Sequence, residues 1–163
     1  MKTSREEMQA GLPGLMPRLW RYGLVLSGNR EDAGDLAQAT ALRALERSHQ
    51  FKAGTRLDRW CFTILGSIWR NELRSRSVRR GQGLVPAEEA DLIAPDKSET
   101  NIMATQVLSE MMKLPEAHRE TMFLVYVEGY SYVEAAERLE IPVGTVMSRL
   151  STGRRRLNSE MAE

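Results

Sequence analysis

The sequence has little of what disulfide-stapled, zinc-binding or membrane proteins require. Cys61 is the single cysteine among 163 residues, so neither an internal disulfide nor a cysteine-based zinc site can form. The longest apolar stretches, such as residues 122–127, are far too short to span a bilayer. The first ten residues are polar and lack the apolar core of a signal peptide. We therefore expect a protein of the reducing cytoplasm, without membrane insertion.

Signals of catalysis are equally scarce. His49 and His118 are the two histidines and lie far apart in the chain, and no nucleophile–base–acid order or Gly-rich phosphate loop is present. We expect no enzymatic activity, no metal and no cofactor. The net charge is only +1, so binding to nucleic acid would have to rest on local clusters of basic residues.

Helical periodicity is what the sequence does contain. Hydrophobic residues make up 42% and charged residues 28%, as in a globular protein, and the length allows two small domains. Apolar residues recur at helical spacing, which predicts an all-α fold with three helices in the first half and four in the second. We predict domains over residues 10–80 and 101–160. Between them, residues 81–100 are rich in glycine, proline and acidic residues, which indicates a flexible linker.

Several helix boundaries follow from single residues. Pro13 and Pro17 are tolerated only before or within a first turn, so the first helix is predicted to begin near residues 14–17. Asn29 can cap the second helix, and a third extends from Leu57 into a run of arginines. In the second half, Ser131 has a glutamate three residues later, the pattern of a capping box at a helix start.

Residues 131–157 contain the most specific pattern, a short capped helix, a tight turn over residues 140–144 and a longer helix. This order is typical of a helix-turn-helix. The early outward positions of the final helix carry short or flexible side chains suited to base edges, and arginines suited to phosphates follow. A plain helical hairpin with a solvated basic end is the alternative, and we favour DNA binding. Gly153 inside this helix predicts local fraying.

A second cluster combines aromatic and basic residues around the start and end of the third helix. Stacking surfaces beside cations suit an unpaired base. Trp60 is explained equally well as a core residue, and arginines also favour a helix C-terminus, so both interpretations stay open. Asp35 and Gln38, on the second helix, indicate by themselves only a solvated surface.

Taken together, these motifs resemble a known family, the extracytoplasmic-function (ECF) sigma factors of the sigma-70 type. The first half is similar to their region 2 through residues 35–40 (Asp-Leu-Ala-Gln-Ala-Thr), Phe51, Gly54, Thr55, Trp60, Ile64 and the arginine run. The second half is similar to region 4 through Leu114, Pro115, Arg119, residues 128–132 (Glu-Gly-Tyr-Ser-Tyr), Ala136, residues 144–146 (Gly-Thr-Val) and residues 148–150 (Ser-Arg-Leu). The resemblance covers residues 12–157 in the family's order.

The resemblance implies a division of labour between the two domains. Asp35 and Gln38 would dock on the clamp helices of the polymerase beta-prime subunit, and region 4 would also touch the beta flap. Region 2 would trap a flipped base and the backbone of the −10 element with Phe51, Lys52, Arg56, Arg59, Ser67, Arg70 and Arg74. The final helix would enter the major groove of the −35 element with Thr145, Met147, Ser148, Arg149, Ser151, Thr152, Arg154 and Arg155. Core RNA polymerase, promoter DNA and an anti-sigma factor are the implied partners, and the polymerase carries out the chemistry.

Departures from the family pattern concern base choice. Ser67 stands where an asparagine is common, and Met147, Ser151 and Thr152 replace residues that are often basic or aromatic, so the promoter sequence is not predicted. Two other functions remain as alternatives. One is a helix-turn-helix regulator that works without core polymerase, and the other is a sigma-like mimic that titrates an anti-sigma factor.

Overall fold

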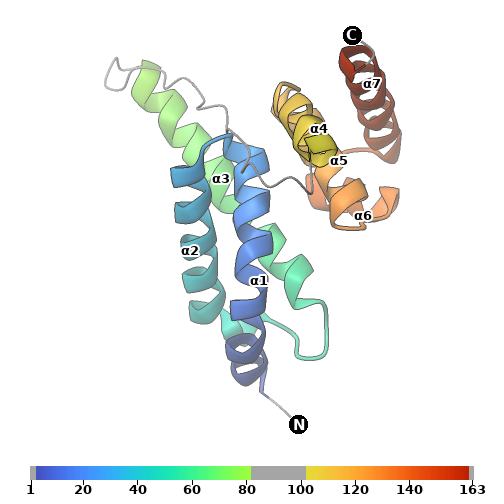
Figure 1. Cartoon of the computed structure of the whole chain (residues 1–163). Helices are drawn as coiled ribbons and strands as arrows, with labels where there is room; N and C mark the ends of the chain where they lie inside the picture. The colour runs from blue at the N-terminus through green and yellow to red at the C-terminus, as the bar shows by residue number, and fades with distance from the viewer. Residues whose placement is uncertain (1–2, 82–101, 162–163) are drawn as a thin grey trace. The chain divides into compact units, whose positions relative to one another are not determined.

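The computed structural model describes residues 3–81 and 102–161, and every regular element within these ranges is a helix or a helical turn (Figure 1). The predicted all-α fold is confirmed for these residues. The chain divides into two compact units. We refer to the described residues 3–81 as unit 1 and to 102–161 as unit 2. The predicted linker, apart from Gly81, lies outside the described residues.

Unit 1 is a three-helix bundle of α1 (Ser4–Ser27), α2 (Arg30–Glu46) and α3 (Leu57–Gly81), with a short 3₁₀ turn η1 (Ser48–Gln50) before α3. The two aromatic rings at its centre, Tyr22 and Phe62, meet edge to face with centroids 5.2 Å apart. α1 and α2 approach closely at Gly23, where a side chain would come within 3.1 Å of the Ala33 Cα. The largest fully buried side chains of unit 1 are Tyr22, Phe62, Met8, Leu19, Leu26 and Leu65.

The predicted start of the first helix near residues 14–17 is wrong, because α1 begins at Ser4. Thr3 caps it, with the Glu6 amide donating to the Thr3 hydroxyl over 3.2 Å and the Thr3 amide donating to the Glu6 carboxylate over 2.9 Å. Pro13 and Pro17 lie inside the helix, yet both are exposed. The backbone hydrogen bonds that they remove therefore face water, which can satisfy the freed carbonyls.

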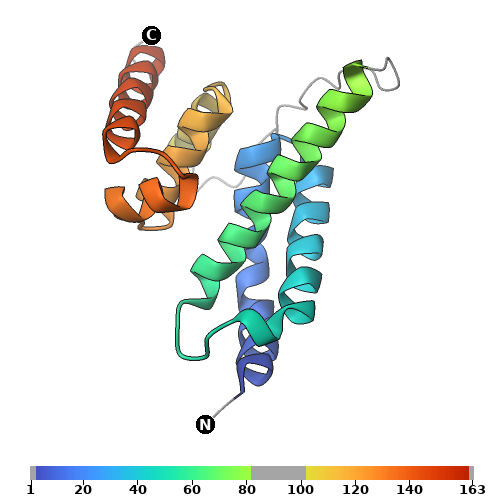
Figure 2. The ribbon, with the colours of Figure 1, turned by 180° about the vertical axis from the view of Figure 1, so that it is seen from behind.

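The C-terminal turns of α3 extend beyond the loop that joins α1 to α2 (Figure 2). An ion-pair network fastens this part of α3 to the start of α2, because Arg76 pairs with Asp32 at 3.0 Å and with Glu72 at 3.0 Å. Arg79 joins the network through Glu72 at 3.2 Å. Part of the basic run is thus neutralised within the protein.

Unit 2 contains α4 (Ile102–Met112), α5 (Glu116–Met122), α6 (Tyr132–Leu139) and α7 (Val143–Met161). Between α5 and α6 the chain widens into a π turn, η3 (Phe123–Val127), in which the Glu128 amide donates to the Phe123 carbonyl over 3.0 Å. The predicted capping box at the start of α6 is confirmed, with Ser131 and Glu134 exchanging hydrogen bonds of 2.9 and 3.0 Å.

The helix-turn-helix of α6 and α7 is built on a small apolar core, in which Ala135, Val146 and Leu150 have no exposed surface. Glu140 adopts a left-handed conformation, with φ of 56°, and so forms the tight turn between the helices. The predicted fraying at Gly153 is wrong. This glycine is buried, and a side chain there would collide with the Met122 sulfur, so it permits close packing of α7 on α5.

Candidate nucleic-acid and polymerase interface

The exposed face of α7 can be identified from the buried residues on the opposite side of the helix. Val146, Leu150 and Gly153 follow one another at helical spacing and are buried, which fixes the rotation of the helix. The predicted −35 residues divide accordingly into an exposed and a half-buried group. The exposed residues are Met147, Ser148, Ser151, Arg154 and Arg155, and the half-buried ones are Thr145, Arg149 and Thr152.

The arginines of α7 have different hydrogen-bond partners. Arg154 donates a hydrogen bond to the Tyr126 hydroxyl, which belongs to the π turn. Arg155 reaches the Thr152 hydroxyl over 3.3 Å. The pKa of His118, on α5, is lowered by burial first and then by the charges of Arg156 and Arg149. His118 is therefore neutral at pH 7 and adds no charge to this surface.

The loop between η1 and α3 carries the residues predicted for the −10 element. Lys52 and Arg56 are exposed, whereas the Phe51 side chain is only 3% exposed and packs against the Trp60 ring at 5.3 Å between centroids. The loop turns through Gly54, whose φ is 82°, and the Thr55 hydroxyl donates to the Lys52 carbonyl over 2.6 Å. The loop backbone is thus held by a hydrogen bond within the loop, and the Lys52 side chain is exposed to solvent.

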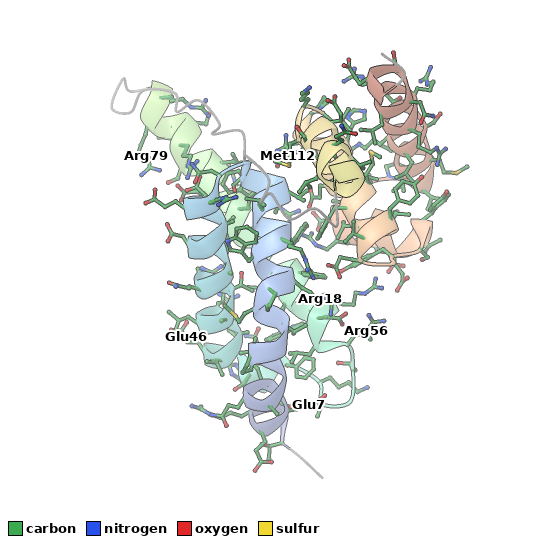
Figure 3. All side chains as sticks on the ribbon, viewed as in Figure 1. Glu7, Arg18, Glu46, Arg56, Arg79 and Met112 are labelled. Atoms are coloured by element: carbon green, nitrogen blue, oxygen red, sulfur yellow. The ribbon has the colours of Figure 1, made fainter. Side chains whose placement is uncertain are left out.

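Asp58 lies at the junction of this loop with α1 and α3. It accepts hydrogen bonds from Arg18 over 2.9 Å and from Arg56 over 3.0 and 2.8 Å, and the Arg59 amide donates another over 2.9 Å. Figure 3 shows Arg18 on the side of α1 that faces the loop and Arg56 at the loop's end. Burial alone would raise the pKa of Asp58, but the hydrogen bonds from Arg56 and Arg18 outweigh it and hold the pKa well below its usual range.

The remaining −10 residues form one stripe along α3. At about 100° per residue, positions 59, 67, 70 and 74 fall within roughly 80° of arc, so their side chains follow one edge of the helix. Arg70 and Arg74 are exposed, while Arg59 and Ser67 are half-buried. Thr63 belongs to the same stripe and is exposed. Thr63 was not predicted, although its position four residues after Arg59 is a detectable signal.

The residues predicted to bind polymerase lie on the outer face of α2. Asp35 and Gln38 are both exposed, and Ala39 and Leu42 continue the same stripe at spacings of four and seven residues from Asp35. Leu42 is 60% exposed, which is high for a large aliphatic side chain. It was not predicted, and its spacing from Asp35 could have identified it.

The described residues contain no group of three or more histidine, cysteine, aspartate or glutamate side chains arranged to hold a metal ion. Burial, followed by the charge of Asp58, raises the pKa of the Cys61 thiol to about 12, so this cysteine stays protonated at neutral pH. None of the helices in the described ranges has both the length and the apolar character needed to cross a membrane.

Comparison with known proteins matches both units to one family. Residues 14–79 match the family described as Sigma-70 region 2, and residues 104–157 match Sigma-70, region 4. The ECF RNA polymerase sigma factor EcfG of Rhodopseudomonas palustris is 33% identical over 156 residues, which cover 95% of this chain and 83% of the relative. The ECF RNA polymerase sigma factor SigL of Mycobacterium tuberculosis is 30% identical over 147 residues, covering 89% and 83%.

A solved structure gives the same result. The sigma factor RpoE of Bartonella quintana, crystallised with the anti-sigma factor NepR, matches with a TM-score of 0.78 and 26% identity, covering 96% of this chain and 97% of that one. The chain therefore belongs to the family of ECF RNA polymerase sigma factors. As a member of this family of DNA-binding initiation factors, it acts with core RNA polymerase in promoter-specific transcription initiation. The predicted family and function are confirmed.

Proposed function

We propose that three exposed stripes divide the work of this sigma factor. The outer face of α2 binds polymerase, the loop before α3 together with the α3 stripe binds the −10 element, and the outer face of α7 reads the −35 element. The observation that carries the proposal is that the predicted residues on α2, α3 and α7 are exposed or half-buried, while the opposite side of each helix is buried in its own unit. Each stripe is thus presented by a fixed helix.

For the −10 element, the cations have distinct tasks. Lys52, Arg70 and Arg74 are exposed and suit phosphates of an unpaired strand. Ser67 and Arg59, half-buried on the same stripe, border the position of a flipped base. We assign Phe51 to support of the loop through Trp60, since its ring is buried.

For the −35 element, α7 enters the major groove of duplex DNA. Ser148 and Ser151 are exposed hydroxyls suited to base edges, and Met147 offers an apolar contact to a thymine methyl group. Arg155 suits a phosphate beside the groove. Arg149, Arg154, Thr145 and Thr152 flank this face and complete the proposed contact set.

For polymerase, Asp35 and Gln38 supply polar contacts to the beta-prime clamp helices, and Leu42 supplies an apolar one. Because the polymerase forms the phosphodiester bonds, we propose that the chain has no catalytic residues of its own and works in the cytoplasm. An anti-sigma factor is a further proposed partner, supported by the relative from Bartonella quintana, which was crystallised with one.

Variants that separate polymerase binding from DNA binding test the assignment. Replacing Arg155 with alanine should weaken holoenzyme binding to a −35 duplex about tenfold and lower the slope of log affinity against log salt by about 1, because one phosphate contact is lost. Asp35→Ala should weaken binding to core polymerase about fivefold or more, as expected for a central interface contact. Binding is measured by fluorescence anisotropy at several salt concentrations.

The matched control is Arg21→Ala, an exposed arginine of α1 outside all three stripes. It should leave both affinities within about twofold of the original protein. If Arg155→Ala reduced polymerase affinity as much as DNA affinity, or if Asp35→Ala left polymerase binding unchanged, the assigned roles of these residues would be wrong.

A further inference from the structure

The loop proposed to hold the −10 element makes a contact far away in sequence. The Gly54 amide, at the turn of the loop, donates to the Glu7 carboxylate, with oxygens at 3.0 and 3.4 Å. Glu7 lies in the first turn of α1, 47 residues earlier in the chain (Figure 3). It also precedes residue 14, where the match to Sigma-70 region 2 begins.

A hydrogen bond to the Gly54 amide constrains the loop at its turn. The Gly54 φ of 82° lies in the left-handed region, and nothing lies within 4 Å of where a side chain would be. Gly54 is exposed, so its amide donates either to water or to an acceptor within the protein. Glu7 supplies a charged acceptor, which gives a stronger hydrogen bond than a neutral group does. The carboxylate therefore selects one conformation of the loop tip.

The same part of α1 also supports the end of the loop. Gly11 lies one turn after Glu7, and a side chain there would come within 2.7 Å of the Leu57 Cδ2 atom. Leu57 is the first residue of α3 and follows the loop directly. Met8, next to Glu7, has no exposed surface, so the first turns of α1 are anchored in the core of unit 1.

We propose that Glu7 is a positioning residue for −10 recognition, which braces the loop through the Gly54 amide so that Lys52 and Arg56 are presented in one fixed arrangement. The inference rests on the proposed role of this loop. Thr55 reinforces the brace from within, since its hydroxyl ties the loop to the Lys52 carbonyl. Fixing the loop before DNA arrives lowers the conformational entropy lost on binding.

Glu7→Ala removes the acceptor, whereas Glu7→Gln keeps an amide oxygen that can accept from Gly54. Gln9→Ala is the matched control, an exposed side chain on the same turn. The full-length variants are assembled with core polymerase. Their affinities are measured for a forked DNA in which the −10 element of a promoter transcribed by the protein is single-stranded. Amide hydrogen exchange at Gly54 is measured by NMR on the free chain.

We expect Glu7→Ala to accelerate exchange at Gly54 and to weaken binding of the forked DNA, each about three- to tenfold, the range set by the net contribution of one solvent-exposed hydrogen bond. Glu7→Gln should show a smaller loss than Glu7→Ala, because its neutral oxygen accepts a weaker hydrogen bond. Gln9→Ala should stay within about twofold, and affinity for core polymerase should not change in any variant. A merely structural role would lower thermal stability without changing the DNA affinity of the folded protein.

Lys52→Ala distinguishes the two ways in which the inference can fail. If Lys52→Ala weakens binding of the forked DNA but Glu7→Ala changes neither this binding nor exchange at Gly54, the brace is refuted and the role of the loop stands. If neither variant changes binding of the forked DNA, the assignment of the loop to the −10 element is refuted, and the inference with it.

Discussion

Asp58 keeps its negative charge at the start of α3 because arginines from two elements approach it. Arg18 comes from α1 and Arg56 from the loop, so the carboxylate joins the segment that carries the −10 residues to the first helix. Its side chain is 11% exposed, and a carboxylate this buried is stabilising only while it is paired. Asp58 is therefore one of the groups that fix the position of the loop.

Asp58→Asn should destabilise unit 1 by about 1–2 kcal/mol at pH 7, because it leaves both arginines without their acceptor charge. The lowered pKa of Asp58 sets the direction of the pH effect. Its contribution is fully present above about pH 4, the pKa range of an unfolded aspartate, and is lost as the pH falls through the lower pKa of the folded state. The difference between the original protein and the variant should therefore shrink below about pH 4.

Urea unfolding followed by tryptophan fluorescence measures this difference in the full chain. The three tryptophans, Trp20, Trp60 and Trp69, all lie in unit 1, so the signal reports on that unit alone. Glu46→Gln, an exposed carboxylate at the end of α2, serves as the control and should change stability by less than about 0.5 kcal/mol. Equal stability of Asp58→Asn and the original protein at pH 7 would contradict the proposed role of the ion pairs.

Some residue-scale features could be predicted from sequence and others could not. The Ser131 cap followed directly from local spacing, since a capping box is formed by residues three apart. Local spacing could not predict that Arg76 is paired with Asp32, 44 residues away, or that Phe51 is buried, because both depend on how the helices pack. The finding that part of the basic run is neutralised came only from the structure.

At the scale of elements, α1 and the π turn after α5 show what local sequence patterns did not predict. Pro13 and Pro17 predicted a later start for α1, but burial of Met8 and Leu12 stabilises the earlier turns. The π turn after α5 left no recognisable signal in the sequence. It directs Tyr126 outward, where its side chain is 50% exposed and accepts a hydrogen bond from Arg154. Tertiary packing outweighed local propensity in both places.

The close approach of Gly153 to Met122 predicts how substitutions at these two positions change the stability of unit 2. In the original protein, Gly153→Ala should be close to neutral, since the gain in helix propensity of about 1 kcal/mol is offset by displacement of the Met122 side chain. Once Met122→Ala has removed the obstruction, adding Gly153→Ala should stabilise unit 2 by about 1 kcal/mol.

The stability of unit 2 is followed by hydrogen exchange at the amides of Leu150 and Leu124, two fully buried residues of α7 and η3. A double-mutant cycle over the four proteins isolates the coupling between the two positions. An equal effect of Gly153→Ala in both backgrounds would show that Met122 does not restrict this position. A large loss in the Met122→Ala background would show that other atoms do.

At the scale of the whole molecule, the chain combines two compact units with different partners. Unit 1 carries the exposed stripes assigned to polymerase and to the −10 element, on α2 and on the loop with α3. Unit 2 carries the helix-turn-helix assigned to duplex DNA. The family of both units could be identified from motifs in the sequence, since these are local strings. The exposed stripes could be identified only from the structure, because exposure is a property of the folded helix.

Run-off transcription tests the central claim most directly. Purified core RNA polymerase is supplied with DNA from upstream of the chain's own gene, with and without the protein. A start site that appears only when the protein is present, and that is lost in a variant carrying Asp35→Ala and Arg155→Ala together, is the result we predict. Tight and specific DNA binding in the absence of polymerase, together with no new transcript on any template that binds, would contradict the account.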